Sequence, residues 1–169
     1  MLRLLTILLL PMSTVSYAQL PEKPEKYFDF WIGDWEGTWD EGDGKIGKGT
    51  NRIEKILDGK VLQENFEITE GQSKGFKGTS ISVYHAASKT WKQSWADNQS
   101  TFYYFKGSVD GDNRIFQTEV FDMPDGSRLT QRMVFKEIEE DSMTWDWEAS
   151  KDGGYTWTLS WRIQYKRKT

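Results

Sequence analysis

Residues 157–165 read WTLSWRIQY, a stretch in which Trp, Leu, Trp, Ile and Tyr alternate with Thr, Ser, Arg and Gln. A period of two residues is that of a β-strand whose two faces meet different surroundings. Residues 91–96 (WKQSWA) repeat the pattern, with Trp91, Gln93 and Trp95 on one face. The two stretches predict strands with an aromatic face turned toward an interior.

Similar runs fill the rest of the chain and are separated by turn dipeptides. Asp-Gly occurs at 43–44, 58–59, 110–111 and 125–126, and Gly-Gly at 153–154; such dipeptides are typical of tight hairpin turns. No segment of a dozen residues has the 3.6-residue period of a crossover helix, so neighbouring strands are expected to pair antiparallel. The pattern predicts ten strands, at 34–41, 46–57, 60–69, 76–84, 90–96, 101–108, 114–122, 127–138, 142–149 and 155–166.

The number of strands favours closure of the sheet. Ten short strands in an open sheet would leave two unpaired edges, whereas a barrel leaves none. The predicted fold is therefore all-β: a single closed antiparallel up-and-down barrel of about ten strands over residues 27–169. A short helix is expected near its start, where residues 25–30 follow Pro24, because proline is favoured at the first position of a helix.

The N-terminus has the pattern of an export signal. Arg3 precedes an apolar run at 4–10, and Ser16-Tyr17-Ala18 fits a cleavage site. We expect a signal peptide at 1–18, a linker at 19–26, and a bacterial protein that is periplasmic or secreted. The apolar run is far shorter than the roughly 20 residues that span a bilayer, and no Cys follows it to carry a lipid. No membrane span is therefore expected.

Composition excludes several kinds of chemistry. The 169 residues contain no Cys and one His, which excludes disulfides, cysteine nucleophiles and sites with several histidines. No metal site is expected. The net charge of −4 argues against a nucleic-acid partner, because such binding depends on clustered Lys and Arg. The basic cluster at 166–168 is interpreted as a solvated chain end.

Gly33-Asp34-Trp35 resembles the Gly-x-Trp element of calycins, the barrels of lipocalins and fatty-acid-binding proteins. The resemblance implies that Gly33 and Trp35 are structural, and that Trp35 closes one barrel end beneath a cation from the last strand. Arg162 is the best match for this cation, and Arg167 is the second choice. Such stacking contributes about 0.5–2 kcal/mol.

The chain more specifically resembles the bacterial family named domain of unknown function 1579. The matching segments cover nearly all of the expected mature chain, and they are GDWEG (33–37), ILDGKVL (56–62), FKG (76–78) and WADN (95–98). His85 stands where such proteins usually carry an Asp. Related barrels of the nitrobindin type bind haem through a histidine, which makes haem at His85 one hypothesis. The following residues AASK (86–89) predict a solvent-facing turn instead, so no cofactor is expected.

The segment SKDGGYTW at 150–157 resembles the Asp-box of sialidase propellers. The resemblance implies a hairpin staple, in which the Asp152 carboxylate accepts hydrogen bonds from turn amides and Trp157 packs on the adjoining strand. A single copy predicts the turn between the last two strands. Sialidase activity is not implied, because the chain lacks the repeated blades of a propeller.

Aromatic walls and nearby polar groups are the candidate binding features. Trp95 offers a flat surface, and Asp97 and Asn98 begin a connection placed at the barrel mouth; an Asx turn is the alternative interpretation of this pair. The aromatic residues could equally form a packed core without a cavity. The further candidates are Gln63, Asn65, Tyr104, Gln131, Arg132 and Trp147, with Trp145 as an alternative to Trp147.

Three function classes remain open. The favoured one is an exported barrel that binds a small hydrophobic or amphipathic molecule, with affinity from apolar burial and orientation from amides. The second is an isomerase, cyclase or hydratase with Asp97 or Glu64 as base; Asp146 and Glu148 share a strand face, but paired acids of this kind are usually solvated. The third is a protein-interaction domain, which an exposed apolar patch would indicate. The sequence names neither the ligand nor the oligomeric state.

Overall fold

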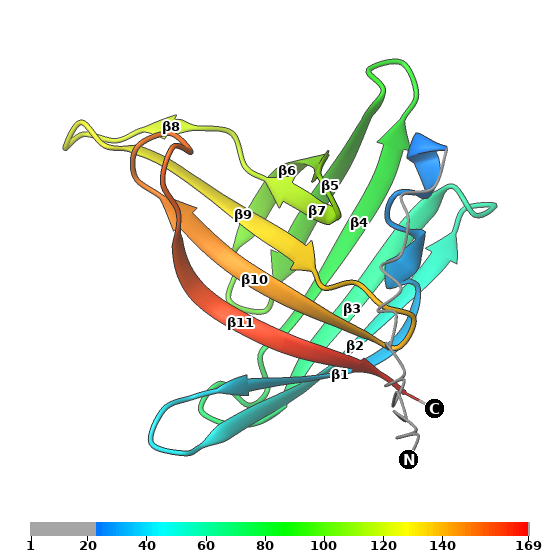
Figure 1. The fold of residues 1–169 in the computed structure, drawn as a ribbon, viewed down its shortest axis with the longest axis vertical. Helices are drawn as coiled ribbons and strands as arrows, with labels where there is room; N and C mark the ends of the chain where they lie inside the picture. Colours follow the sequence, from blue (N-terminus) through cyan, green and yellow to red (C-terminus); the bar gives the residue numbers. More distant parts are fainter. Residues whose placement is uncertain (1–22, 169) are drawn as a thin grey trace, which may run out of the picture.

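The described part of the chain is built almost wholly of β-strands (Figure 1). The structure is a computed structural model that describes residues 23–168. The predicted signal peptide and residues 19–22 of the predicted linker lie outside the described residues. The strands are β1 (Gly33–Asp40), β2 (Ile46–Ile56), β3 (Val61–Glu70), β4 (Lys77–His85), β5 (Thr90–Asp97), β6 (Phe102–Asp110), β7 (Asn113–Gln117), β8 (Phe121–Asp122), β9 (Arg128–Lys136), β10 (Ser142–Ser150) and β11 (Thr158–Arg167).

Ten of these strands form a closed ring. Their order is β10-β11-β1-β2-β3-β4-β5-β6-β7-β9, and β9 pairs back onto β10. Neighbouring strands in the ring pair antiparallel, and the two-residue β8 adds only to the far end of β9. The predicted closed antiparallel barrel is confirmed, and its form is consistent with a calycin-like fold.

The hairpin turns lie where the dipeptides predict them. Asp58 and Gly59 both have positive φ, at 58° and 75°, between β2 and β3. Gly153 and Gly154 have φ of 81° and 99° between β10 and β11. Positive φ is inexpensive for glycine and is tolerated best by Asp and Asn among other residues, which explains why these dipeptides mark the turns.

The predicted seventh strand, 114–122, is interrupted after Gln117. The Thr118 Oγ1 accepts the backbone N–H of Gln131 at 3.0 Å, and the Thr130 Oγ1 donates to the Thr118 carbonyl at 3.2 Å. Side-chain hydroxyls therefore replace regular ladder partners at this point. The single predicted strand becomes β7 and β8.

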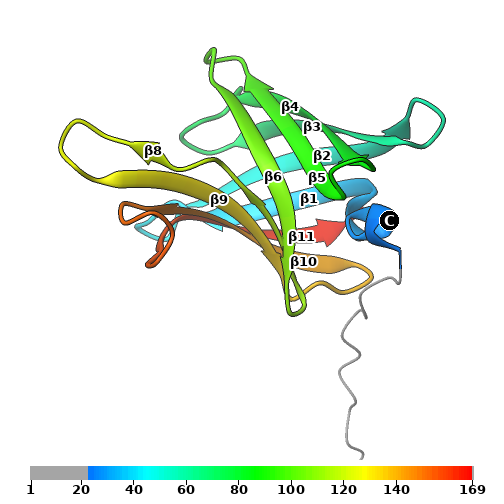
Figure 2. The ribbon, with the colours of Figure 1, turned by 90° about the horizontal axis from the view of Figure 1, so that it is seen from above.

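Two single-turn 3-10 helices close one end of the barrel. They are η1 (Pro24–Lys26) and η2 (Asp29–Trp31), and they take the place of the predicted short helix. Figures 1 and 2 show them at the end opposite the β8–β9 and β10–β11 loops. Phe28 and Trp31 are fully buried here, and the Phe28 ring lies 4.3 Å from the Phe116 ring. This end of the interior is filled.

The predicted inward-facing residues are buried on most of β5 and β11, and the prediction fails at the start of β11. Trp91 and Gln93 are buried as predicted on β5, and Ile163 and Tyr165 are buried on β11. Leu159, predicted on the same face as Ile163, is 45% exposed. An irregularity in the pairing next to Trp147 shifts the register of β10 against β11 and breaks the alternation there.

Candidate functional site

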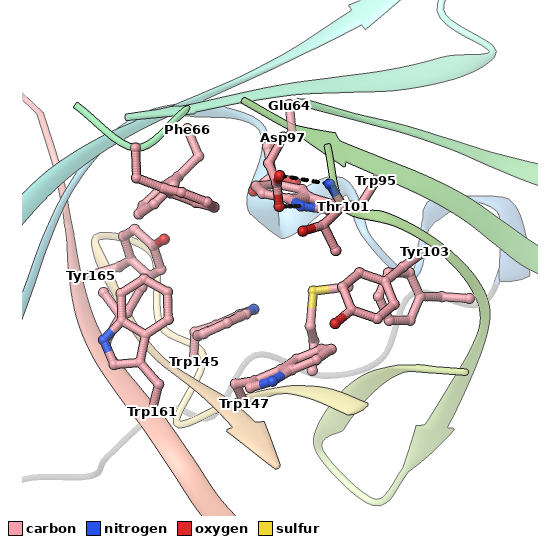
Figure 3. Close-up of a pocket in the computed structure, with 14 residues that line it drawn as sticks. Glu64, Phe66, Trp95, Asp97, Thr101, Tyr103, Trp145, Trp147, Trp161 and Tyr165 are labelled. Atoms are coloured by element: carbon pink, nitrogen blue, oxygen red, sulfur yellow. Dashed lines mark hydrogen bonds between the residues drawn. The ribbon is translucent and has the colours of Figure 1, made fainter. Parts of the chain in front are cut away.

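A cavity of about 200 Å³ lies inside the barrel, toward the end away from the N-terminal turns (Figure 3). Strand ends and loops that lie far from these turns contribute to its wall, including the β3–β4 and β5–β6 connections. Nine of its fourteen lining side chains are aromatic. The lining residues are Glu64, Phe66, Phe76, Trp95, Asp97, Thr101, Tyr103, Phe105, Met133, Trp145, Trp147, Trp161, Ile163 and Tyr165.

Register brings the aromatic side chains together in pairs. Trp95 on β5 lies directly opposite Tyr103 on β6, and Trp147 on β10 lies opposite Trp161 on β11. Directly opposed residues of antiparallel strands share one face of the sheet. The Trp145 and Trp147 rings are 6.3 Å apart and nearly parallel, with 8° between their planes. The walls are therefore large flat ring surfaces.

The orientation of Trp95 depends on a glycine of β4. A Cβ at Gly78 would overlap the Trp95 ring, so a larger residue at this position must displace the indole. Phe76 lies on the other side, with its ring 6.5 Å from that of Trp95 and 22° between their planes. The FKG segment thus positions one wall of the cavity.

Glu64 is a buried carboxyl group in the cavity wall. The Asn51 Nδ2 donates to Glu64 Oε1 at 2.7 Å, and the Ser80 Oγ donates to Oε2 at 2.7 Å. Desolvation raises the pKa of Glu64 to about 7 against the opposing effect of the hydrogen bonds from Ser80 and Asn51. Glu64 can therefore gain or lose a proton near neutral pH.

Asp97 lies at the mouth of the cavity and is held by its own turn. The backbone N–H groups of Gln99 and Thr101 donate to Asp97 Oδ1 at 2.9 and 3.0 Å, and the Trp95 Nε1 donates to Oδ2 at 3.3 Å. Desolvation acts to raise the pKa of Asp97, but the hydrogen bonds from Thr101, Gln99 and Trp95 outweigh it and lower this pKa. Asp97 therefore closes an Asx turn and also presents an ionised carboxylate to the cavity.

Three of the predicted ligand-binding residues line the cavity, and they are Trp95, Asp97 and Trp147. The charged groups in the cavity lining are carboxylates, and none of the predicted amides lines it. Gln63 and Asn65 lie on the outer face of β3, because Leu62, Glu64 and Phe66 fill its inner face. A shift of one residue exchanges the two faces of a strand.

Asn98 also lies outside the cavity and serves the loops instead. Its Nδ2 donates to the Gly75 carbonyl at 2.9 Å, and its Oδ1 accepts the Lys77 N–H at 3.1 Å. Both ends of the amide are therefore engaged in joining the β3–β4 loop to the β5–β6 connection.

Tyr104 points away from the cavity and is 72% exposed. Its ring packs edge-on against that of Phe102 at 4.9 Å, on the outer face of β6. The preceding residue, Tyr103, is the one that lines the cavity. Both faces of this strand are aromatic, so composition alone could not decide between the two tyrosines.

Gln131 and Arg132 of β9 do not line the cavity either. Gln131 is half-buried beside Thr118, whose hydroxyl accepts its backbone N–H. The Arg132 Nε donates to Glu148 Oε2 at 2.6 Å, and its guanidinium lies 3.9 Å from the centre of the Trp157 ring. Arg132 thus joins β9 to the β10–β11 hairpin on the outside of the barrel.

The Asp-box segment forms the turn between β10 and β11. Asp152 accepts hydrogen bonds from the backbone N–H groups of Tyr155 and Thr156, and from the hydroxyls of Ser150 and Thr156. These hydrogen bonds, that of Ser150 foremost, lower the pKa of Asp152. The Trp157 Nε1 donates back to the Gly154 carbonyl at 3.1 Å. The geometry is that of a hairpin staple, and none of residues 150–157 lines the cavity.

The cation above Trp35 is Arg167 and not Arg162. The Arg167 guanidinium lies 4.1 Å from the centre of the Trp35 ring, and the two residues are paired in register. A Cβ at Gly33 would overlap Arg167 Nη1, so this glycine makes room for the stack. Arg162 instead points outward, and its Nε donates to Asp146 at 2.7 Å.

The two acids Asp146 and Glu148 are not a catalytic pair of the cavity. Asp146 is fully buried but on the outer side of the sheet, where Lys136 Nζ lies 2.6 Å and Arg162 Nε 2.7 Å from its carboxylate. Glu148 pairs with Arg132. Both acids are therefore neutralised on the outside, and the expectation that they are solvated is wrong for Asp146.

His85 is exposed at the end of β4, where its Nδ1 lies 2.6 Å from Ser88 Oγ. The β4–β5 turn is at the plugged end of the barrel, and His85 does not line the cavity. Its position gives no axial ligand for haem in the cavity. Within residues 23–168, no group of three or more His, Cys, Asp and Glu residues is placed to hold a metal ion.

Several lining residues escaped the sequence analysis. Glu64 was named only as a possible base, and Tyr103, Trp161 and Tyr165 were not named as ligand contacts. The alternation of Leu62, Phe66 and Ile68 is a signal that places Glu64 on the inner face of its strand. Pairing across a short turn at 98–101 likewise places Tyr103 beside Trp95.

Comparison with known proteins gives one result. A search of curated proteins found no match. The family model described as a protein of unknown function, DUF1579, matches residues 20–167. None of the helices within the described residues is long and apolar enough to cross a membrane. The match covers nearly all of the chain beyond the predicted signal peptide, and the chain therefore belongs to the DUF1579 family.

Proposed function

We propose that the protein binds a small molecule, mostly apolar and with one polar or charged end, in the cavity of the barrel. The observation that supports this is the hollow itself. Protein cores are normally close-packed, yet a pocket of about 200 Å³, partly open to solvent, remains between nine aromatic side chains. Lining by rings with a few convergent polar groups is typical of small-molecule sites.

The size of the cavity restricts the ligand. Sites for drug-sized molecules span about 300–1,000 Å³, and this cavity is smaller. A molecule of one or two rings matches it better than a long acyl chain does. The flat walls formed by Trp145 and Trp147 suit a planar ligand.

Neighbouring tyrosines provide a matched test. The probe is 1-naphthol, a neutral two-ring amphipathic molecule, titrated by isothermal titration calorimetry. Tyr103→Ala removes part of the cavity wall and is expected to weaken binding by about fivefold or more, because a buried ring contact is worth about 1 kcal/mol or more. Tyr104→Ala removes the same side chain from the outer face and should leave the affinity unchanged.

Two outcomes would contradict the proposal. One is the absence of 1-naphthol binding together with the absence of any retained small molecule in native mass spectrometry of the purified protein. The other is an equal loss of affinity in Tyr103→Ala and Tyr104→Ala, which would place the binding outside the cavity.

Export is part of the proposal. It is supported by the charged, apolar and small-residue segments of residues 1–18. Expression of the full chain followed by cell fractionation and N-terminal sequencing tests it. A mature N-terminus at Gln19 in the periplasm or medium is expected, whereas an intact cytoplasmic chain would contradict export.

A second candidate function is catalysis by Glu64. Burial raises the pKa of Glu64 to about 7, while the pKa of Asp97 is lowered in the same cavity. Two acids with oppositely shifted pKa values are a common arrangement of a general acid or base beside a fixed charge. Once native mass spectrometry identifies a ligand, incubation with the protein should convert it, and Glu64→Gln should bind it without conversion. Unchanged ligand with the wild-type protein would exclude this candidate.

A further inference from the structure

The fixed charges in the cavity lining are of one sign. The ionisable lining side chains are Glu64, Asp97, Tyr103 and Tyr165, and no Lys, Arg or His belongs to the described lining. Asp97 is ionised at neutral pH, and Glu64 adds a second negative charge as the pH rises through 7. The described lining of the cavity therefore carries negative charge and no cation.

Three positive side chains of the adjoining strands point outward and are already paired. Lys136 on β9 and Arg162 on β11 both contact Asp146 on the outer side, at 2.6 and 2.7 Å. Arg132 on β9 pairs with Glu148 at 2.6 Å. None of these three side chains lines the cavity, so their charges are balanced without reaching the carboxylates inside.

The aromatic faces add to the same preference. Trp145, Trp147, Trp161 and Tyr103 surround the hollow in Figure 3, with Asp97 across from them. The faces of aromatic rings carry negative electrostatic potential, and several rings around one site are the usual means of holding an organic cation. A cation stacked on these rings would also be screened from water, which strengthens the attraction.

Asp97 retains the capacity to accept one more contact. Its Oδ1 takes two backbone N–H groups, while Oδ2 takes the long hydrogen bond from Trp95 Nε1 at 3.3 Å. A carboxylate oxygen can accept two hydrogen bonds. Oδ2 can thus face an ammonium group at the cavity mouth without losing its role in the turn.

We propose that the ligand of this cavity is an organic cation, a small alkylated ammonium compound or a charged nitrogen ring, held by the aromatic walls and by Asp97. The inference rests on the proposed binding function and specifies its ligand class. The walls supply cation–π contact, and Asp97 supplies the counter-charge. A neutral or anionic molecule of the same shape therefore binds less tightly.

Three probes of one shape and different charge test the proposal on the wild-type protein. Phenyltrimethylammonium, tert-butylbenzene and benzenesulfonate share a phenyl ring and a tetrahedral head, with charges of +1, 0 and −1. Calorimetric titration at pH 7.5 is expected to give the cation at least about tenfold tighter binding than the neutral probe, and no measurable binding of the anion. Equal affinities for the cation and the neutral probe, or tighter binding of the anion, would overturn the proposal.

A matched pair of variants locates the counter-charge. Asp97→Asn keeps an oxygen for the turn amides and removes the charge, and should weaken phenyltrimethylammonium binding by about fivefold or more while changing tert-butylbenzene binding by less than twofold. Glu67→Gln removes the same charge from the outer side of β3, where Glu67 pairs with Lys77. It should leave both affinities unchanged, and an equal loss in the two variants would overturn the role of Asp97.

The outcomes separate this inference from the proposed function. If the neutral probe binds as well as the cation, the ligand class is wrong and the binding function stands. If none of the three probes binds but 1-naphthol does, only the ligand class is wrong. If 1-naphthol also fails to bind and no molecule is retained in native mass spectrometry, both fail.

Discussion

Carboxyl groups buried in this barrel behave differently because their partners differ. Asp146 is fully buried, but contacts with Arg162 and Lys136 outweigh desolvation and lower its pKa. Glu64 is buried with the neutral donors Asn51 and Ser80, so desolvation prevails and its pKa rises. Neutral hydrogen-bond donors compensate a buried negative charge less well than cations do. The same chemical group is therefore a fixed anion on the outer side and a titratable acid in the cavity.

The raised pKa of Glu64 makes stability fall with increasing pH. Its pKa is 4.5 in the unfolded reference and about 7 in the folded barrel, so the folded state holds the proton more tightly. Below about pH 4.5 the stabilisation that the shifted pKa provides is complete. It is lost progressively between about pH 4.5 and 7, and no further stability is lost through this group above about pH 7. A difference of this size corresponds to roughly 3 kcal/mol. Tyr165, whose pKa is raised, and Asp97, whose pKa is lowered, do not titrate in this interval.

Glu64→Gln should remove this pH dependence. Glutamine keeps an acceptor for Asn51 and cannot ionise, so its free energy of unfolding relative to wild type should increase by about 3 kcal/mol between pH 4.5 and 8. Urea denaturation at a series of pH values measures this. Glu67→Gln, at an outer-face acid of the same strand, is the control and should run parallel to wild type. Parallel curves for Glu64→Gln as well would contradict the prediction.

At the scale of elements, Arg167 joins three segments at the plugged end. Its guanidinium donates to the carbonyls of Ile32 at 2.7 Å and Phe30 at 3.3 Å in the N-terminal segment, and to that of Glu140 at 2.9 Å in the β9–β10 loop. It also stacks on Trp35 of β1. One side chain of β11 therefore joins the first strand, the N-terminal turns and the β9–β10 loop.

Two substitutions of Arg167 should lower the free energy of unfolding by different amounts. Arg167→Ala removes three hydrogen bonds and the stack, at about 1 kcal/mol for each hydrogen bond and 0.5–2 kcal/mol for the stack, and should cost about 3.5–5 kcal/mol in urea denaturation. Arg167→Lys keeps the charge without the planar fork and should lose about half as much. If Arg167→Lys were as unstable as Arg167→Ala, the charge above Trp35 would contribute nothing.

The elements were predictable because their signals are local. The Asp58-Gly59 turn and the alternation from Trp161 to Tyr165 can be read from adjacent residues, and both lie where they were expected. The assignment of Arg162 to Trp35 failed because the pairing of β1 with β11 is set by contacts far apart in the sequence. Gln63 and Asn65 were misplaced because Glu64, a charged residue, occupies an inward position that an apolar residue normally fills. A charged side chain at an inward position breaks the pattern on which the prediction depends.

At the scale of the whole molecule, the two barrel ends have different roles. Phe28 and Trp31 enter one end from outside the ring of strands and leave no space there. The other end keeps its rings around a hollow, where Trp147 is half-buried. Burial at the first end contributes to stability, since Phe28, Trp31 and Phe116 are fully buried there. The rings at the second end have one side facing the cavity.

Substitutions at the two ends should therefore separate stability from binding. Phe28→Ala creates a cavity among Phe116, Trp91 and Phe135 and should cost about 3–5 kcal/mol in urea denaturation. Trp147→Ala enlarges a space that already exists, so its cost should stay below about 2 kcal/mol, while 1-naphthol affinity falls by about tenfold or more. Calorimetry on the folded fraction should give Phe28→Ala an affinity close to wild type, because its contacts lie outside the cavity lining. Equal destabilisation by the two variants, with equal loss of binding, would mean that the barrel has one continuous core and no specialised end.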